Sequence, residues 1–228
     1  MLFFSVLALV TLTVAVPHSK RATTFFNPND GGGRMLTDAT GGFGAADDLG
    51  EPLNVIISGT SSAAVLTDDG FLNYAQSLGF SFECLGLHLG GPQSANLGDG
   101  NGWVNQTVEY RQDYGNEEIG TCLESLIGGN HLRMFRQNGS SEDTGALFLA
   151  VSQEEDVADG HDIVANGYDI GRNALVASAI AVGGTNANGV SYSTTALNIT
   201  GLLAAGAAGV NHDIATDGVT TLLTVTIL

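Results

Sequence analysis

Hydrophobic and polar positions follow two different periods in the region after residue 50. The run from Leu53 to Gly59 is apolar and β-branched and ends in glycine, which predicts a buried strand. A helix is predicted next, with Thr67 as its N-cap and Gly79 as its stop. Its apolar positions at helical spacing are Phe71, Leu72, Tyr74, Ala75 and Leu78. Residues 80–87 alternate weakly and predict a second strand.

The pattern in the middle of the chain predicts two strands and a helix. Residues 130–137 alternate as a strand, whereas residues 145–152 are apolar on both faces, which favours a central, buried position. One face of the first strand would hold His131, Arg133, Phe135 and Gln137, and the other face Leu132, Met134 and Arg136. A helix is predicted from Asp169 to about Val182, and Gly183-Gly184 would end it.

Glycine-containing turns separate most of the remaining extended runs. Asn-Gly and Asp-Gly pairs in these places favour antiparallel hairpins. A two-residue turn at Asp217-Gly218 would set His212 opposite Leu223, so that the imidazole points inward. The patterns together predict a single α+β domain over residues 51–228, with a mixed, mostly antiparallel sheet and two main helices.

The N-terminus carries targeting signals rather than fold signals. Residues 2–16 are uncharged and apolar, too few for a bilayer span of about 20 residues but suited to a signal peptide over residues 1–16. A signal anchor remains the alternative. Residues 17–21 end in Lys20-Arg21 and are expected to be a short pro-segment with a dibasic processing site. Residues 22–50 lack a sustained period and are expected to form a flexible lead-in.

Cysteines and glycosylation motifs agree with a secreted, extracellular protein. The two cysteines, Cys84 and Cys122, are expected to form a disulfide bond. Three Asn-x-Ser/Thr motifs make Asn105, Asn138 and Asn198 candidate glycosylation sites. No later segment reaches membrane-spanning length without interruption, so no membrane association is expected after removal of the signal peptide.

Charge limits the classes of partner. After Arg21 the chain has five arginines against 24 carboxylates, a formal charge of 5 − 24 = −19. Nucleic acid is therefore not expected, because its binding depends on neutralising phosphates. Cationic and neutral partners remain open, the partner itself is unknown, and no cofactor is predicted.

The few cations are concentrated between residues 131 and 172. A chain with so few positive charges is expected to use them where they gather. The candidate catalytic residues in this stretch are His131, Arg133, His161 and Arg172, with Asp156 and Asp169 as orienting acids.

Four segments of the chain together resemble the LssY C-terminal domain family. They are residues 52–59, 131–136, 146–156 and 161–172. The residues that match the family's pattern are His131 and Arg133 on the strand, Asp156 at the strand end, His161 in the turn, and Asp169 and Arg172 at the helix start. Phe135 and Asp162 depart from it, standing where tryptophan and a second histidine are usual. The resemblance spans residues 52–183 and implies a fold and a candidate site, but no activity.

Three interpretations of these residues remain open. In the structural one, Asp169 pairs with Arg172 along the helix and Arg133 pairs with Asp156. In the second, the two arginines hold an anionic group while a histidine acts as acid or base. In the third, the histidines bind a metal, but no His-x-His or His-x₃-His pair supports this and no metal site is predicted. The weak candidates for such a site are His131, His161 and His212.

The sequence thus predicts a secreted acidic glycoprotein, with two functions open. The first is a non-catalytic role. The alternative is an extracellular hydrolase that acts on an anionic or ester substrate through the histidine and arginine side chains.

Overall fold

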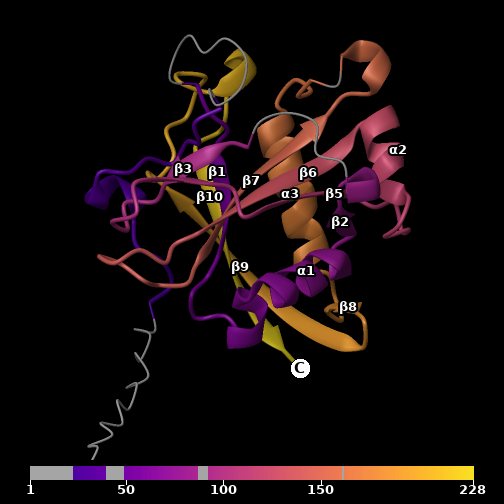
Figure 1. Ribbon diagram of the computed structural model, residues 1–228, viewed down its shortest axis with the longest axis horizontal. Coiled ribbons are helices and arrows are strands. Elements are labelled where there is room, and N and C mark those ends of the chain that lie inside the picture. The colour runs from indigo at the N-terminus through magenta and orange to yellow at the C-terminus, as the bar shows by residue number, and fades with distance from the viewer. Residues whose placement is uncertain (1–22, 40–48, 87–91, 161) are drawn as a thin grey trace, which may run out of the picture.

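One eight-stranded sheet organises the domain (Figure 1). The computed structural model describes residues 23–39, 49–86, 92–160 and 162–228. The sheet has the strand order β2-β5-β6-β7-β1-β10-β9-β8. Its strands are β1 (Leu53–Ile57), β2 (Phe80–Phe82), β5 (Val108–Gln112), β6 (Gly129–Arg136), β7 (Leu147–Glu154), β8 (Thr185–Ala187), β9 (Val190–Thr200) and β10 (Val219–Ile227). Neighbouring strands are antiparallel except for β1 and β10, which are parallel. The α+β class with a mostly antiparallel sheet is confirmed.

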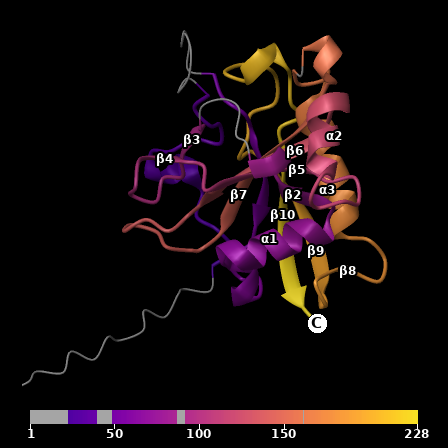
Figure 2. The ribbon, with the colours of Figure 1, turned by 45° about the vertical axis from the view of Figure 1, so that its right-hand side comes forward.

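A second, two-stranded sheet pairs β3 (Ser94–Asn96) with β4 (Trp103–Asn105). It lies beside the large sheet in Figure 2. In the described part of the chain, no helix combines the length and the apolar character needed to cross a membrane.

The two predicted helices are present as α1 (Asp68–Ser77) and α3 (Gly167–Ala179). The Thr67 hydroxyl accepts a hydrogen bond from the Gly70 N–H at 3.1 Å, as an N-cap does. Gly79 has a φ of +86°, a left-handed conformation that suits glycine after a helix. The strand expected over residues 80–87 is shorter than predicted, because a 3-10 turn begins at Cys84.

A third helix, α2 (Gly120–Ile127), was not predicted, and its amphipathicity is inverted. Its buried positions include Thr121 and Glu124, whereas Leu123 and Leu126 are exposed. The N-cap residue, Ile119, has a side chain that cannot cap the helix. The Asn116 carboxamide oxygen instead accepts hydrogen bonds from the backbone N–H groups of Glu118 and Ile119. The apolar residues Ile119, Leu123, Leu126 and Ile127 do recur at helical spacing, but they are exposed, and the buried side of the helix carries polar residues instead.

Different layers cover the two faces of the large sheet. Helices α1 and α3 lie on one face, where Phe71, Tyr74 and Leu175 join the apolar side chains of the central strands. Loops and the N-terminal segment cover the other face, together with α2, whose Glu124 contacts Arg111 there. The residues that pack there include Met35, Leu97, Phe135, Phe148, Leu203 and Leu222. Charged side chains from β5, β6 and β7 share this second face with Phe135.

Residues 23–39 differ from the flexible lead-in expected for residues 22–50. Met35 is buried in the core of the second face, and Leu36 forms a β-bridge with Pro52. Thr37 donates to Gln93 and accepts from the Glu51 N–H. These residues therefore belong to the domain; residues 40–48 lie outside the described ranges.

The predicted hairpin at Asp217-Gly218 is wrong. Strand β10 pairs with β9 on one side and with β1 on the other, so its two edges are already occupied. His212 consequently lies in a 3-10 turn over Asn211–Asp213, with a φ of +58°, and is exposed rather than opposite Leu223. The eleven-residue strand β9 makes a longer ladder with β10 than residues 210–216 offer.

Close approach of α3 to the sheet depends on Gly171. A Cβ atom at this position would lie 2.7 Å from both Asn130 Oδ1 and the Ser152 carbonyl carbon. The Asn130 side chain donates to the Gly171 carbonyl at 2.9 Å. The helix is thereby held directly on β6 and β7, the strands that carry the candidate site.

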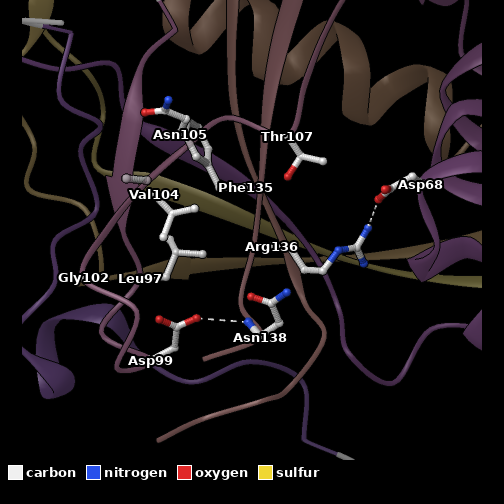
Figure 3. Close-up of a pocket in the computed structure, with 11 residues that line it drawn as sticks. Asp68, Leu97, Asp99, Gly102, Val104, Asn105, Thr107, Phe135, Arg136 and Asn138 are labelled. Carbon is white, nitrogen blue, oxygen red and sulfur yellow. Dashed lines mark hydrogen bonds and ion pairs between the residues drawn. The ribbon is translucent and has the colours of Figure 1, made fainter. Parts of the chain in front are cut away.

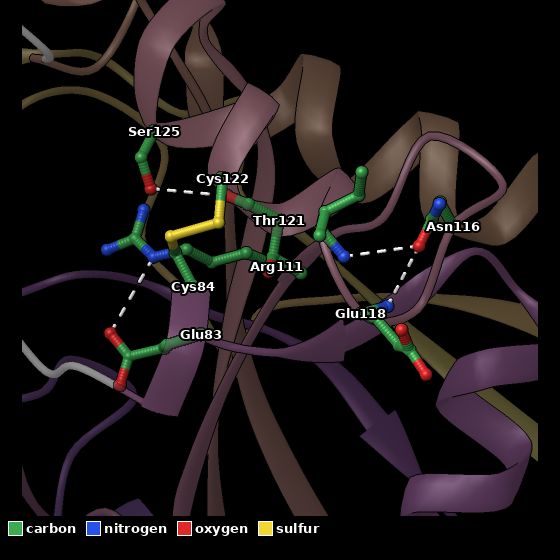
Figure 4. Close-up of a disulfide and its surroundings, with 9 residues drawn as sticks. Glu83, Cys84, Arg111, Asn116, Glu118, Thr121, Cys122 and Ser125 are labelled. Carbon is green, nitrogen blue, oxygen red and sulfur yellow. Dashed lines mark hydrogen bonds and ion pairs between the residues drawn. A yellow bond between two sulfur atoms is a disulfide. The ribbon is translucent and has the colours of Figure 1, made fainter.

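The predicted disulfide between Cys84 and Cys122 is present and ties α2 to the end of β2 (Figure 4). It closes a loop with a sequence separation of 38 residues. The double replacement Cys84→Ala/Cys122→Ala is expected to lower the free energy of unfolding by about 3 to 4 kcal/mol, because the unfolded chain gains freedom. Urea denaturation of the variant and of the wild type measures this difference. An unchanged midpoint for the variant would contradict the expectation.

Candidate functional site: a buried charge cluster

Charged side chains from three adjacent strands point to the same face of the sheet. In the antiparallel ladder, Arg111 faces His131 and Glu109 faces Arg133. Residues that face each other across a ladder project to the same side. Glu154 extends the group along β7. We call the full set the buried charge cluster, and its members are Glu51, Glu109, Arg111, Glu124, His131, Arg133 and Glu154.

These seven residues are almost entirely removed from solvent. Glu124 and His131 are 0% exposed, and Glu154 and Arg111 are 8% exposed. Arg133 exposes 13% of its side chain, which is the largest value among the seven. Charged groups at this depth are rare in proteins unless they are paired.

Arg111 is the hub of the cluster. Its Nη1 lies 2.9 Å from Glu124 Oε2 and 2.8 Å from Glu154 Oε2, so one nitrogen contacts two carboxylates. Its Nη2 donates to Glu109 at 2.9 Å. Its Nε lies 3.6 Å from Glu83, a partly exposed glutamate at the rim, as Figure 4 shows. The planar guanidinium is suited to such a set of partners because its donors have a fixed fork geometry.

His131 lies between two carboxylates. Its Nδ1 is 3.0 Å from Glu154 Oε1, and its Nε2 is 4.0 Å from Glu51 Oε2. Arg133 completes the arrangement by pairing with Glu109 and by placing its Nε 3.4 Å from Glu51 Oε2. The cluster is therefore continuous from Glu124 on α2 to Glu51 before β1.

The environment shifts the pKa values of several members. Burial and the neighbouring Glu154 carboxylate raise the pKa of Glu124 to about 7, against the opposing effect of Arg111. The pKa of His131 is also raised: burial lowers it, but the charges of Glu154 and Glu51 outweigh burial. The pKa of Glu109 is lowered, because Arg133, His131 and Arg111 outweigh the opposite effect of burial.

Several buried polar atoms of the cluster have no hydrogen-bond partner among the described residues. They are Glu51 Oε2, Glu124 Oε1 and Arg133 Nε, with the neighbouring Tyr168 hydroxyl. Burial and the Glu51 carboxylate raise the pKa of this tyrosine. Native proteins leave few buried polar atoms unpaired, and such atoms call for a physical explanation.

The structure brings together two of the four predicted catalytic residues. His131 and Arg133 are both in the cluster, but Arg133 pairs with Glu109 rather than with Asp156. The Asp156 carboxylate instead accepts from the N–H groups of the 3-10 turn that follows it. His161 lies outside the described residues.

Arg172 belongs to a different group. Its guanidinium binds both oxygens of Asp217, at 2.7 and 2.8 Å, and lies 3.2 Å from Asp169. Asp169 in turn accepts from the Asp217 N–H. Among the described residues, Arg172 and Arg133 thus share no ion-pair partner, and each is already engaged by carboxylates.

Sequence reasoning missed Glu51, Glu109, Arg111, Glu124 and Glu154. One signal was present: Glu109 and Arg111 alternate around Tyr110 as His131 and Arg133 alternate around Leu132. Two adjacent strands with this pattern bring four charged side chains onto one face. Glu124 and Glu51 carried no such signal, because neither lies on a strand.

Three members of the cluster offer atoms suitable for a metal ion. One ligand atom from each of Glu124, His131 and Glu154 lies within 4.8 Å of the others. His212, one of the weak metal candidates, is instead 3.5 Å from Asp162 at the surface.

An open pocket of about 220 Å³ lies beside the second sheet (Figure 3). Its apolar lining comes from Ala95, Leu97, Val104 and Phe135. Its polar lining comes from Asp68, Asp99, Asn105, Thr107, Arg136 and Asn138. Arg136 pairs with Asp68 at 2.6 Å, and Asp99 accepts from the backbone of Asn138 at 3.0 Å. The described residues that line the pocket include no histidine and no cysteine.

All three candidate glycosylation sites are exposed. Asn105 on β4 and Asn138 after β6 both line this pocket, and Asn198 lies on β9. Attachment of a glycan requires an accessible asparagine side chain, and each of these positions meets that requirement.

Comparison of the chain with protein-family models, with curated proteins and with solved structures finds no match in any of the three.

Proposed function

We propose that this chain is a secreted, N-glycosylated protein that acts by binding a neutral, hydroxyl-rich small molecule of about one sugar ring in size. One observation carries the proposal. The pocket of about 220 Å³ combines apolar side chains with amide, hydroxyl and ion-paired groups. Ligand pockets of this kind use the apolar lining for affinity and the polar groups for orientation.

Secretion rests on three independent features. The apolar run of residues 2–16 has the length of a signal peptide. The Cys84–Cys122 disulfide is typical of proteins that fold in an oxidising compartment. The three candidate asparagines are exposed, as glycan attachment needs.

We also propose a relationship to the LssY C-terminal domain family. It is supported by the motif residues His131, Arg133, Asp169 and Arg172 in the sequence. Arg133 pairs with Glu109, and Arg172 pairs with Asp217. Under this proposal the shared motif residues maintain the fold.

The alternative, a hydrolase that uses His131, Arg133, His161 and Arg172, has less support. His131 is 0% exposed, and each arginine is neutralised by a carboxylate. An arginine that binds an anionic substrate must release its carboxylate partner first, which is unfavourable in a buried site.

The replacement Val104→Arg tests the pocket, because it places a long charged side chain at a position that lines the pocket. We expect the wild type to bind at least one of glucose, galactose, mannose and N-acetylglucosamine by saturation-transfer NMR, and the variant to lose this signal. Leu197→Arg is the matched control: Leu197 is 61% exposed on β9 and Val104 is 49% exposed on β4. The control is expected to bind like the wild type.

Because Asn105 and Asn138 line the pocket, binding is measured before and after enzymatic trimming of the glycans to a single sugar. Absence of binding in both forms, or equal binding by Val104→Arg, would contradict the proposal. Hydrolysis of an ester substrate that is abolished by His131→Gln would favour the hydrolase instead.

A further inference from the structure

Within the buried charge cluster, Glu124, His131 and Glu154 come from three different elements and converge on one point. They lie on α2, β6 and β7, and one ligand atom of each is within 4.8 Å of the other two. One imidazole nitrogen and two carboxylate oxygens form a donor set that Zn²⁺ uses. Bonds of about 2.0 to 2.2 Å place the ligand atoms of a tetrahedral zinc site roughly 3.3 to 3.6 Å apart. Small side-chain shifts reach that geometry.

We propose that Glu124, His131 and Glu154 bind one divalent transition-metal ion, with Zn²⁺ as the best match to their donor atoms. This site is separate from the pocket beside the second sheet and does not depend on the function proposed for it.

The formal charge of the cluster supports the binding of a cation. Four enclosed carboxyl groups, from Glu51, Glu109, Glu124 and Glu154, face two guanidinium groups, so the formal charge is 2 − 4 = −2 when Glu124 and His131 are both deprotonated, as metal ligands must be. Glu83, whose side chain is 14% exposed, adds a fifth carboxylate next to Arg111. A buried net charge is costly unless it is compensated. One divalent ion supplies +2 to this deprotonated cluster.

Unpartnered atoms supply an independent observation. Glu124 is 0% exposed, and its Oε1 has no hydrogen-bond partner among the described residues. A carboxylate oxygen in this condition is available as a ligand. On the far side of the imidazole, Glu51 Oε2 lies 4.0 Å from His131 Nε2 and is also without a hydrogen bond. Metal-binding histidines commonly direct their second nitrogen toward a carboxylate.

Arg111 must move when the ion binds. Its Nη1 contacts both Glu124 and Glu154, which places its positive charge against two of the three ligands. The same guanidinium keeps contacts with Glu109 through Nη2 and with Glu83 through Nε. Withdrawal of Nη1 therefore leaves Arg111 paired.

The test uses the full mature protein, purified without a histidine tag and freed of metal with EDTA. Calorimetric titration with Zn²⁺ is expected to give one equivalent bound. We expect Glu124→Gln, His131→Gln and Glu154→Gln each to weaken binding at least tenfold. Glu109→Gln is the matched control, because Glu109 belongs to the cluster and contacts Arg111 but is not among the three ligands. It is expected to retain the equivalent, as is His212→Ala at the surface.

A second measurement needs no variant. Co²⁺ added to the wild-type protein is expected to give the intense visible absorption of a tetrahedral site with nitrogen and oxygen ligands, and Zn²⁺ is expected to displace it. Failure of the wild type to bind Zn²⁺, or the lack of this absorption, overturns the proposal. Undiminished Zn²⁺ binding by folded Glu124→Gln and His131→Gln proteins overturns it as well.

Discussion

Replacing Arg111 with methionine is expected to lower the free energy of unfolding by about 3 to 5 kcal/mol, or to prevent folding. The guanidinium contacts Glu109, Glu124 and Glu154, and its loss leaves these carboxylates buried without their shared cation. Methionine keeps much of the packing volume, so the effect reports charge rather than a cavity. Chemical denaturation of the purified variants measures the difference.

Arg136→Met is the control for this prediction. Arg136 pairs with Asp68, whose side chain is 66% exposed, so removal of the arginine leaves a carboxylate that water can solvate. The expected loss is about 1 kcal/mol or less. Equal losses for the two variants would contradict the view that burial makes Arg111 critical.

The second large effect is a loss of stability as pH rises. The pKa of Glu124 is raised from 4.5 to about 7 in the folded protein, so between these values the folded state holds a proton that the unfolded state has released. The stabilisation is therefore complete below pH 4.5 and is lost as pH rises through 7. It amounts to about 3 kcal/mol at most, from a shift of 7 − 4.5 = 2.5 units.

The groups around Glu124 influence this pH dependence with different signs. His131 on β6 has a raised pKa and acts in the same direction. Glu154 on β7 raises the pKa of Glu124, and Arg111 on β5 lowers it. Tyr114, before α2, has a pKa raised by burial and by Glu124 and stays neutral across this window.

Thermal unfolding in EDTA from pH 5 to pH 8 tests this dependence. The wild-type melting temperature is expected to fall with rising pH, and Glu124→Gln is expected to flatten most of the slope. Glutamine is neutral at every pH and keeps the shape of the side chain. A wild-type curve that rises over this range, or an unchanged slope in the variant, would show that Glu124 does not hold the proton.

Hydrophobic periodicity predicted the elements that bury apolar side chains. Strand β7 and helices α1 and α3 are examples, and Thr67 and Gly79 marked the ends of α1 correctly. It failed where polar groups are buried or where distant strands compete. Helix α2 buries Glu124, and β9 takes the edge of β10 that a local hairpin would have used.

The candidate site was predicted only in part, for a related reason. His131 and Arg133 stood out because cations are scarce in this chain. Their partners are glutamates, and 24 carboxylates give no means of selecting Glu51 or Glu124 from the rest. Only the strand register and the position of α2 determine which carboxylates reach the cluster.

We predict above all that the buried charge cluster binds one divalent ion. Diffraction data collected at the zinc absorption edge, from crystals of the protein grown with Zn²⁺, test it most directly. We predict one anomalous peak at roughly 2.0 to 2.2 Å from an oxygen of Glu124, a nitrogen of His131 and an oxygen of Glu154, with Arg111 Nη1 withdrawn. No peak at this place, with Arg111 Nη1 still against both carboxylates, would contradict it.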